Sequence, residues 1–219
     1  MVNTMLIRKL AVTGICVLTL MSFSVLAEID PWAESYRLEK LYQYDAALNA
    51  LNAAANNGPD SELLLLRRGW LHYQSGNHSK SIVFYKKAIR ANNQSLEARL
   101  GIILPLLAQQ RWREAMLESE KILEVAPWNY QAHIYLMTCE QALNQWPTLE
   151  KHAQQVAERY PTDAAVLVFL ARASHYSGNR DAAARAYQKV LHISPAVSYT
   201  HLTLPTIQHW CRSRWSPYH

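Results

Sequence analysis

Apolar and polar residues follow a helical period over residues 62–95. In the first half of this stretch, residues at i, i+3, i+4 and i+7 share one face of a predicted helix: Leu65, Arg68, Gly69 and His72. Gly76 and Asn77 then interrupt the period with residue types that favour a turn. A second predicted helix follows, with an inner stripe formed by Ser81, Tyr85 and Ala88. The pattern therefore predicts two amphipathic helices joined by a tight turn.

The same pattern recurs along the chain in steps of 34 residues. Five units fit end to end without an inserted residue, and they span residues 28–61, 62–95, 96–129, 130–163 and 164–197. Proline recurs in phase in four of them, at Pro59, Pro127, Pro161 and Pro195. Apolar residues at the inward positions are predicted to form the core: Leu65, Tyr85, Ala88, Leu106, Ile122, Leu136, Leu167, Leu170 and Tyr187. We expect an all-helical fold of stacked units.

A period of 34 residues with small, aromatic and proline positions in this order resembles the tetratricopeptide repeat. The resemblance extends from residue 28 to about residue 196 and is closest in units 62–95 and 164–197. It implies an all-α fold, a right-handed α-solenoid of five helix–turn–helix repeats. Leu149 stands where the family usually has alanine, so we expect the two helices of the fourth unit to pack less closely than is usual.

Residues 1–27 have the pattern of a secretory signal peptide. Arg8 and Lys9 form a short basic region, residues 10–23 are apolar and uncharged, and small or short side chains precede Glu28. The apolar run is shorter than the roughly 20 residues that a stable membrane span needs. We therefore expect cleavage after Ala27, a periplasmic protein, and no membrane span after cleavage. An uncleaved anchor is the alternative.

Residues 197–219 do not continue the repeat. Their two ends, residues 197–206 and 211–219, resemble the translation of a transposase-type sequencing adapter, and residues 207–210 lie where a sample index would be. We therefore expect this segment to be foreign to the natural protein and disordered, with the true C-terminus missing. A natural tail containing proline and aromatic residues is the alternative.

The net charge and the cysteine count of the repeats differ from those of the whole chain, because residues 1–27 and 197–219 contribute to both. The whole chain has a net charge of +5, but residues 28–196 hold 18 Lys and Arg against 17 Asp and Glu. Such a balance argues against a nucleic-acid-binding protein. Cys139 is the only cysteine among residues 28–196, so we expect no intramolecular disulfide within them.

Residue types typical of catalysis and of metal binding are present without the spacing that such sites need. Six histidines of the repeats form no H-x-x-x-H pair, and Cys139 has no partner cysteine there. The sequence contains neither a glycine-rich phosphate loop nor a G-x-S-x-G motif. We therefore expect no enzyme activity, no catalytic residues, no metal and no cofactor.

The first helix of each unit carries the candidate binding residues. In tetratricopeptide arrays, the resemblance implies, the second, fifth, ninth, twelfth and thirteenth positions of a unit line a concave groove. We expect a peptide-binding groove formed by Trp32, Tyr36, Leu66, Arg67, Trp70, Tyr73, Leu104, Tyr135, Arg172, His175 and Tyr176. Apolar and aromatic side chains would supply contact area, and the two arginines would orient polar or acidic groups.

The sequence thus predicts a protein–protein interaction scaffold of the bacterial cell envelope, whose partner is another protein or peptide. Three alternatives stay open. A capping helix from the missing C-terminal segment could fill the groove. The repeats could instead be the periplasmic arm of a larger outer-membrane export or assembly protein, or they could recruit substrate for a downstream catalytic domain. The partner's identity and the oligomeric state are left open as well.

Overall fold

The computed structural model describes residues 30–55 and 61–193, so the expected signal peptide (1–27) and foreign tail (197–219) lie outside the described residues. The described residues form ten α-helices and no strand. The helices are α1 (Pro31–Lys40), α2 (Tyr44–Ala55), α3 (Glu62–Gln74), α4 (His78–Ala91), α5 (Leu96–Ala108), α6 (Trp112–Val125), α7 (Tyr130–Ala142), α8 (Trp146–Arg159), α9 (Ala164–Tyr176) and α10 (Arg180–Ile193). No helix in this part of the chain is long and apolar enough to cross a membrane.

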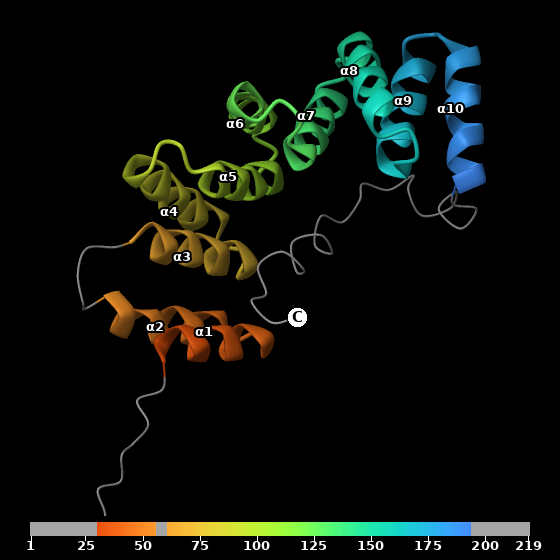
Figure 1. The fold of residues 1–219 in the computed structure, drawn as a ribbon. Coiled ribbons are helices and arrows are strands. Elements are labelled where there is room, and N and C mark those ends of the chain that lie inside the picture. Colours follow the sequence, from red (N-terminus) through yellow and green to blue (C-terminus); the bar gives the residue numbers. More distant parts are fainter. Residues whose placement is uncertain (1–29, 56–60, 194–219) are drawn as a thin grey trace, which may run out of the picture.

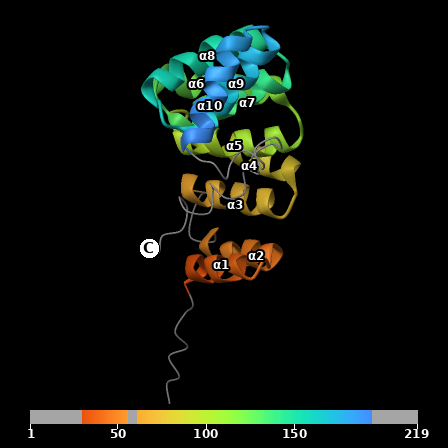
Figure 2. The same ribbon diagram turned by 90° about the vertical axis from the view of Figure 1, so that its right-hand side faces the viewer.

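The helices form five antiparallel pairs that follow one another along an arc (Figure 1). The odd-numbered helices line the inside of the arc and form an inner layer, while the even-numbered helices form an outer layer. Helices α2, α4, α6 and α8 also pack against the first helix of the next pair. Figure 2 shows the same stack, with α1 and α2 at one end and α8 to α10 at the other. The predicted all-α solenoid of five helix pairs is therefore confirmed.

Side-chain caps recur at the starts of the inner helices α3, α5, α7 and α9. A side-chain oxygen of each cap accepts a hydrogen bond from the backbone N–H three residues later, and the four capping residues, spaced by 34, are Ser61, Ser95, Asn129 and Asp163. Such a cap satisfies one of the N–H groups that a helix start leaves unpaired, and it contributes about 1 kcal/mol. Capped helix starts therefore recur with the same 34-residue period as the sequence pattern.

The turn inside each pair contains one residue in the left-handed backbone region. These residues also recur at intervals of 34, and they are Tyr42, Gly76, Gln110, Asn144 and Gly178, with φ angles of 60°, 78°, 57°, 55° and 86°. Glycine adopts this conformation freely, whereas a residue with a Cβ atom is destabilised by roughly 1 kcal/mol. The chain therefore reverses at the same place in every pair, whether or not glycine stands there.

Tyr85 of α4 joins the second helix pair to the third. Its ring is buried between Gly69 of α3 and Gly101 of α5. A Cβ atom at position 101 would lie 2.2 Å from Cε1 of the ring, whereas a Cβ atom at position 69 would lie 3.0 Å from the ring. The contact between Tyr85 and α5 therefore requires glycine at position 101.

Most residues predicted for the core are buried: Leu65, Tyr85, Ala88, Leu106, Ile122 and Leu167. Leu136 and Leu170 are half-buried. The prediction for Tyr187 was wrong, because this residue is 38% exposed. It lies on α10, the last described helix, and no further described helix packs against the outer side of α10 as α5 packs against Tyr85.

The helices of the fourth pair, α7 and α8, approach each other less closely than the helices of any other pair. Leu149 of α8 is fully buried. A leucine side chain keeps helices further apart than the methyl group of alanine does. The loose fourth pair expected from Leu149 is therefore confirmed.

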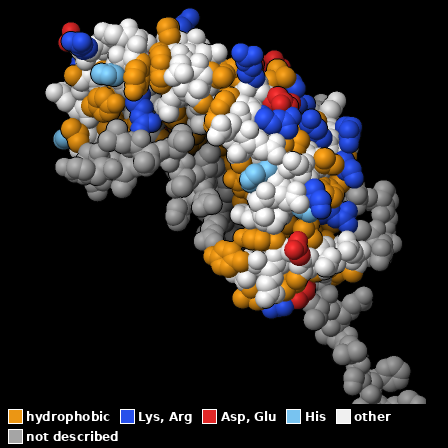
Figure 3. Space-filling model, turned by 180° about the vertical axis from the view of Figure 1, so that it is seen from behind, with side chains coloured by type: hydrophobic (Ala, Val, Ile, Leu, Met, Phe, Trp, Pro, Cys, Tyr) orange, Lys and Arg blue, Asp and Glu red, His pale blue; other side chains and the backbone are white. Residues whose placement is uncertain are grey.

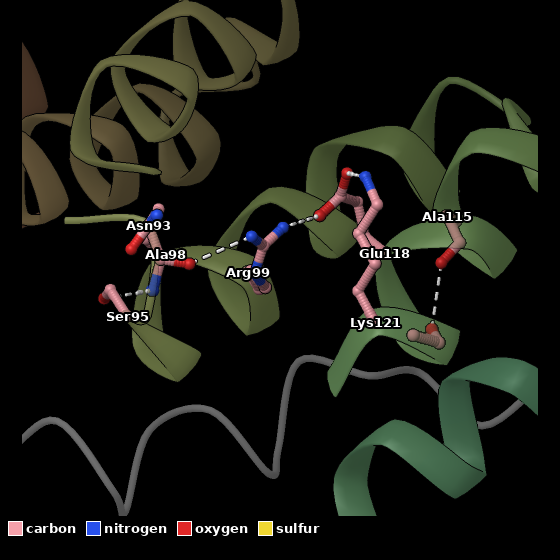
Figure 4. A network of polar contacts seen from close by, with 8 residues as sticks. Asn93, Ser95, Ala98, Arg99, Ala115, Glu118 and Lys121 are labelled. Carbon is pink, nitrogen blue, oxygen red and sulfur yellow. Dashed lines mark hydrogen bonds and ion pairs between the residues drawn. The ribbon is translucent and has the colours of Figure 1, made fainter. Parts of the chain in front are cut away.

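Polar side chains also hold helices of one pair together, as Arg99 does in the third pair (Figure 4). One of its guanidinium nitrogens donates to Glu118 of α6 at 2.8 Å, and the other donates to the carbonyl oxygen of Asn93 at 3.0 Å. Lys121 donates to the second oxygen of Glu118 at 2.8 Å. The carboxylate of Glu118 thus ties α5 to α6, and these charged groups serve internal contacts.

Candidate functional site

A pocket opens between the inner helices α1 and α3, and we call it the α1–α3 pocket. It is lined by Tyr36, Leu63, Leu66, Arg67, Trp70 and Tyr85. Its volume is about 350 Å³ when the space open to solvent is included, but the enclosed part is only about 20 Å³, so the pocket is shallow. The four residues from α3 are spaced i, i+3, i+4 and i+7, so they form one stripe along the helix. Four of the lining residues were predicted for the groove from the sequence: Tyr36, Leu66, Arg67 and Trp70.

The walls of this pocket are largely fixed by packing. Leu66 and Trp70 are 7% and 8% exposed and belong to the hydrophobic core shared by the second, third and fourth pairs. Leu63, in contrast, is 54% exposed. The pocket thus combines a rigid apolar wall with one exposed leucine that a bound partner would cover.

Arg67 is the charged residue of the pocket, and its guanidinium is fully engaged inside the protein. Nε and Nη2 donate to Oγ of Ser35 at 3.3 and 3.2 Å, and Nη1 donates to Oε2 of Glu39 at 2.5 Å. The guanidinium carbon also lies 3.9 Å from the centre of the Tyr36 ring. The side chain of Arg67 is 5% exposed, so Arg67 ties α3 to α1 in this structure.

Glu39 completes this polar cluster. Its second oxygen accepts a hydrogen bond of 2.6 Å from the indole N–H of Trp70. The polar atoms of Arg67 and Trp70 are therefore satisfied by α1, and the pocket presents mainly carbon atoms to a ligand. From the sequence we expect Arg67 to orient an acidic group of a ligand. In the structure, the carboxylate of Glu39 pairs with Arg67 instead.

Other predicted groove residues lie further along the inner layer. The Tyr73 ring lies 5.8 Å from that of Trp70. Leu104 and Tyr135 are 5% and 3% exposed and are part of the same core cluster as Leu66 and Trp70. Trp32 is partly buried against the core of the first pair. These side chains support the α1–α3 pocket or continue the inner surface from it.

The three candidate residues on α9 form a separate group at the far end of the arc from α1 and α3 (Figure 1). Tyr176 is 61% exposed, and its ring stacks on Trp146 with a centroid distance of 4.3 Å. The His175 ring meets Tyr176 edge-on at 5.2 Å, and Arg172 donates to Oε1 of Gln141 at 3.4 Å. The structure therefore divides the predicted groove into two surfaces.

A family comparison bears on the helix pair that forms most of this pocket. Residues 64–95, which include most of α3 and all of α4, match the family model described as Tetratricopeptide repeat. The chain contains a tetratricopeptide repeat. Tetratricopeptide domains are generally protein–protein interaction scaffolds, and they are typically not catalysts.

Solved structures show the same fold beyond this one repeat. MamA from Desulfovibrio magneticus RS-1 is 17% identical, with a TM-score of 0.66 over 73% of this chain and 90% of that chain. A tetratricopeptide repeat protein from Parabacteroides merdae ATCC 43184 is 15% identical, with a TM-score of 0.69 over 76% and 66%. YrrB, described as a TPR protein with an unusual peptide-binding site, is 15% identical, with a TM-score of 0.64 over 77% and 87%.

At these identities the likeness to solved structures establishes the tetratricopeptide fold alone. None of the curated proteins matches the sequence. Among residues 30–55 and 61–193, no group of three or more His, Cys, Asp and Glu side chains is placed to hold a metal ion.

Two residues of the tetratricopeptide array that shape the pocket were not predicted for the groove. Leu63 occupies the second position of its unit, a position that lines the groove in the family, so repeat numbering could have identified it. Tyr85 lies on the outer helix α4 and reaches the pocket from behind α3. The sequence pattern assigned Tyr85 to the core, and no pattern indicates that a core residue also lines a pocket.

His133 of α7 and His152 of α8, treated separately in the sequence, meet in the fourth pair. Nδ1 of His133 lies 2.9 Å from Nε2 of His152, and Nε2 of His133 lies 2.9 Å from the carbonyl oxygen of Pro127. Nδ1 of His152 lies 2.9 Å from Oε2 of Glu140, which is buried. The carbonyl oxygen can only accept, so His133 donates through Nε2 and, when neutral, accepts at Nδ1. The chain of hydrogen bonds is therefore complete when His133 is uncharged and His152 donates through both ring nitrogens, to His133 and to the carboxylate of Glu140.

Stability is expected to fall as the pH drops through the range in which His133 titrates. Its pKa lies below the ordinary value of 6.5, mainly because burial disfavours the charged ring; His152 acts in the same direction, and the hydrogen bond to Pro127 opposes them. Below this value the unfolded chain binds a proton that the folded chain does not. The free energy of unfolding therefore decreases until the pH passes the lower pKa of the folded state.

Urea unfolding of the wild type and of His133→Gln between about pH 7.5 and 5 measures this effect. We expect the wild type to lose stability relative to the variant as the pH falls. His72, whose pKa is also lowered, first by burial and then by Lys80, is present in both proteins and cancels in the comparison. A stability difference that does not change with pH would contradict the prediction.

Proposed function

We propose that the protein is an interaction scaffold of the bacterial cell envelope that binds a peptide or amphipathic helix of a partner protein in the α1–α3 pocket. The tetratricopeptide fold supports the scaffold role, since proteins of this kind bind peptides and other proteins. Export rests on the signal-peptide pattern of residues 1–27. N-terminal sequencing of the protein from a periplasmic extract tests the location. We expect Glu28 as its first residue, whereas recovery of the protein in the cytoplasmic fraction with Met1 intact would contradict export.

The observation that carries the binding proposal is the preformed, largely apolar α1–α3 pocket. Its polar groups are already bonded to Ser35 and Glu39, so an incoming ligand needs no acidic group to neutralise Arg67. Burial of apolar surface contributes about 25 cal/mol per Å². The pocket is shallow, so a partner side chain that covers it would gain the energy of partial burial, without leaving a buried polar atom unpaired.

The stripe on α3 also suggests how a partner would lie. Leu63, Leu66 and Trp70 form an apolar stripe along α3, against which an amphipathic helix can lay its apolar face. Tyr36 on α1 forms the opposite wall. A partner helix between α1 and α3 would therefore place one apolar residue in the pocket and cover Leu63.

Placing a carboxylate at the mouth of the pocket tests this proposal. Leu63→Glu is expected to weaken peptide binding by about tenfold or more, because the charge must be desolvated when the partner covers it. Leu63 is exposed, so the substitution leaves the core intact. Peptides selected from a random phage-displayed library on the wild type would serve as ligands, with dissociation constants from fluorescence anisotropy.

Leu117→Glu is the matched control. Leu117 of α6 is 50% exposed, close to the 54% of Leu63, and it does not line the pocket. We expect this variant to bind the selected peptides as the wild type does. Equal losses in both variants, or a selection that enriches no peptide requiring Leu63, would contradict a binding role for the α1–α3 pocket.

A further inference from the structure

Residues 28–196 are nearly neutral in total, but their positive and negative residues are concentrated in different repeats. Residues 62–95 hold six Lys and Arg and a single acidic residue, Glu62. Residues 28–61 hold two Lys and Arg and six Asp and Glu. Seen from behind in Figure 3, Lys and Arg side chains gather over the second helix pair. The positive charge is therefore local to one part of the surface.

Helix α4 carries most of this charge. Its exposed cations are Lys80, Lys86, Lys87 and Arg90, and the helix contains no Asp or Glu. Within the described part of the chain, none of these four side chains forms a salt bridge with a carboxylate. Lys80, Lys87 and Arg90 are spaced i, i+7 and i+10, so they follow one side of the helix over about 15 Å.

Few carboxylates of neighbouring elements lie near this surface. Asp45 of α2 acts on the pKa of His72 together with Lys80, but among the described residues it forms no salt bridge with Lys80. Glu114 of α6 feels the charge of Lys86, but its two oxygens are bonded to Arg111 at 2.6 Å. Glu62 of α3 accepts a hydrogen bond from Asn92 at 2.8 Å. Arg68 of α3 adds further positive charge beside α4, since its guanidinium carbon lies 5.9 Å from the centre of the Phe84 ring. The cations of α4 therefore face solvent as one group.

Apolar side chains lie among these cations. Val83 is 50% exposed, and it lies between Lys80 and Lys87 on the same side of the helix. Phe84 is half-buried, with Nζ of Lys87 at 5.2 Å from its ring centre. A helix that combines lysines with an exposed aliphatic side chain is typical of segments that lie on a membrane surface, where the charged ends reach headgroups and the apolar groups meet the interface.

We propose that the outer face of α4 docks on a membrane surface that carries anionic lipid headgroups. Helix α4 belongs to the outer, convex layer of the arc (Figure 1), so its exposed side can approach a plane. A planar layer of phosphates meets all four cations at once. The inner surface with the α1–α3 pocket then faces away from the membrane and stays open to a protein partner.

Binding of the full chain to lipid vesicles tests this assignment. The probes are vesicles of equal parts phosphatidylglycerol and phosphatidylcholine, and vesicles of phosphatidylcholine alone, with bound protein measured by co-sedimentation. The ratio of the two binding constants removes any contribution that the rest of the chain makes to both. Each basic residue near an anionic surface contributes about fivefold, so Lys86→Gln with Lys87→Gln should lower the ratio by roughly 25-fold.

Arg185→Gln with Lys189→Gln is the matched control, because it removes the same charge from exposed positions on α10. We expect this variant to keep the wild-type ratio, and we expect the wild-type ratio to fall steeply with added salt. Equal losses in both double variants, or equal binding to both vesicles, would overturn the proposal. Binding to polyglutamate but not to anionic vesicles would also overturn the proposal. It would indicate that α4 binds an acidic protein instead.

Discussion

Replacing Glu39 with alanine is expected to lower the free energy of unfolding by about 3 kcal/mol. The change removes the carboxylate that pairs with Arg67, whose side chain is 5% exposed, and the acceptor of the Trp70 indole N–H. A guanidinium buried without its counter-ion is strongly destabilising. Because Glu39 itself is 22% exposed and water can reach part of the site, we place the effect near the lower end of the range of about 3–5 kcal/mol for broken buried pairs.

The matched control lies on the same helix. Glu34 of α1 pairs with Arg37 at 2.7 Å, but Arg37 is 58% exposed, so Glu34→Ala should cost far less than Glu39→Ala. Equilibrium urea unfolding measures both losses. The combination Glu39→Leu with Arg67→Met, which replaces the pair by apolar side chains, is expected to recover most of the stability. A loss for Glu39→Ala no larger than that for Glu34→Ala would show that burial of Arg67 does not control the result.

Gly101→Ala is expected to cost about 2 kcal/mol, the second largest loss. The new Cβ atom would lie 2.2 Å from the Tyr85 ring, and this ring is buried with Gly69 on another side. Movement of the ring away from α5 therefore brings it closer to α3. Alanine favours the helix over glycine by about 1 kcal/mol, so a net loss means that the clash exceeds this gain.

Gly69→Ala serves as the comparison at the same ring. Its Cβ atom would lie 3.0 Å from Tyr85, so a small shift suffices, and the gain in helix propensity should offset the cost. In a Tyr85→Leu background the shorter side chain removes the clash, and Gly101→Ala should then be neutral or stabilising. Thermal or urea unfolding of the double-mutant cycle measures this coupling. Equal stabilities for Gly101→Ala and Gly69→Ala would contradict the steric argument.

The overall architecture could be predicted because its determinants are local and repeat. Helix spacing, turn residues and caps lie within 34 consecutive residues; the helix pair and its turn recur five times in phase, and the cap recurs four times. The loose packing of α7 against α8 followed from one residue, Leu149, whose size acts at its own position. Burial of Tyr187 could not be judged in the same way, since it depends on what lies beyond the last described helix.

The eighth position of each unit shows why close contacts between helices were harder to predict than the overall architecture. The resemblance places a small residue there, yet the third unit has Ile103. The structure instead uses Gly101, two residues earlier, to receive the ring of Tyr85 from the preceding pair. A small residue can therefore serve the contact with a neighbouring pair, and sequence spacing alone does not say which neighbour it faces.

The candidate site was located in part by repeat position, but its chemistry was not. The stripe of Leu66, Arg67 and Trp70 on α3 follows from helical spacing. That Arg67 bonds to Glu39, 28 residues away, depends on how α1 and α3 are placed in space. The contact between His133 and His152 has the same origin, because these residues lie on different helices with no shared motif.

The recurring left-handed turn residue has a consequence for how such a chain can diverge. Tyr42, Gln110 and Asn144 hold the backbone shape that Gly76 and Gly178 hold elsewhere, at a cost of roughly 1 kcal/mol for each side chain. Packing between pairs can offset a destabilisation of this size in each repeat. The array therefore keeps its geometry where the turn glycine is replaced by another residue. Repeats can in this way lose their family signature while keeping their shape; the family model matches residues 64–95, where Gly76 stands in the turn.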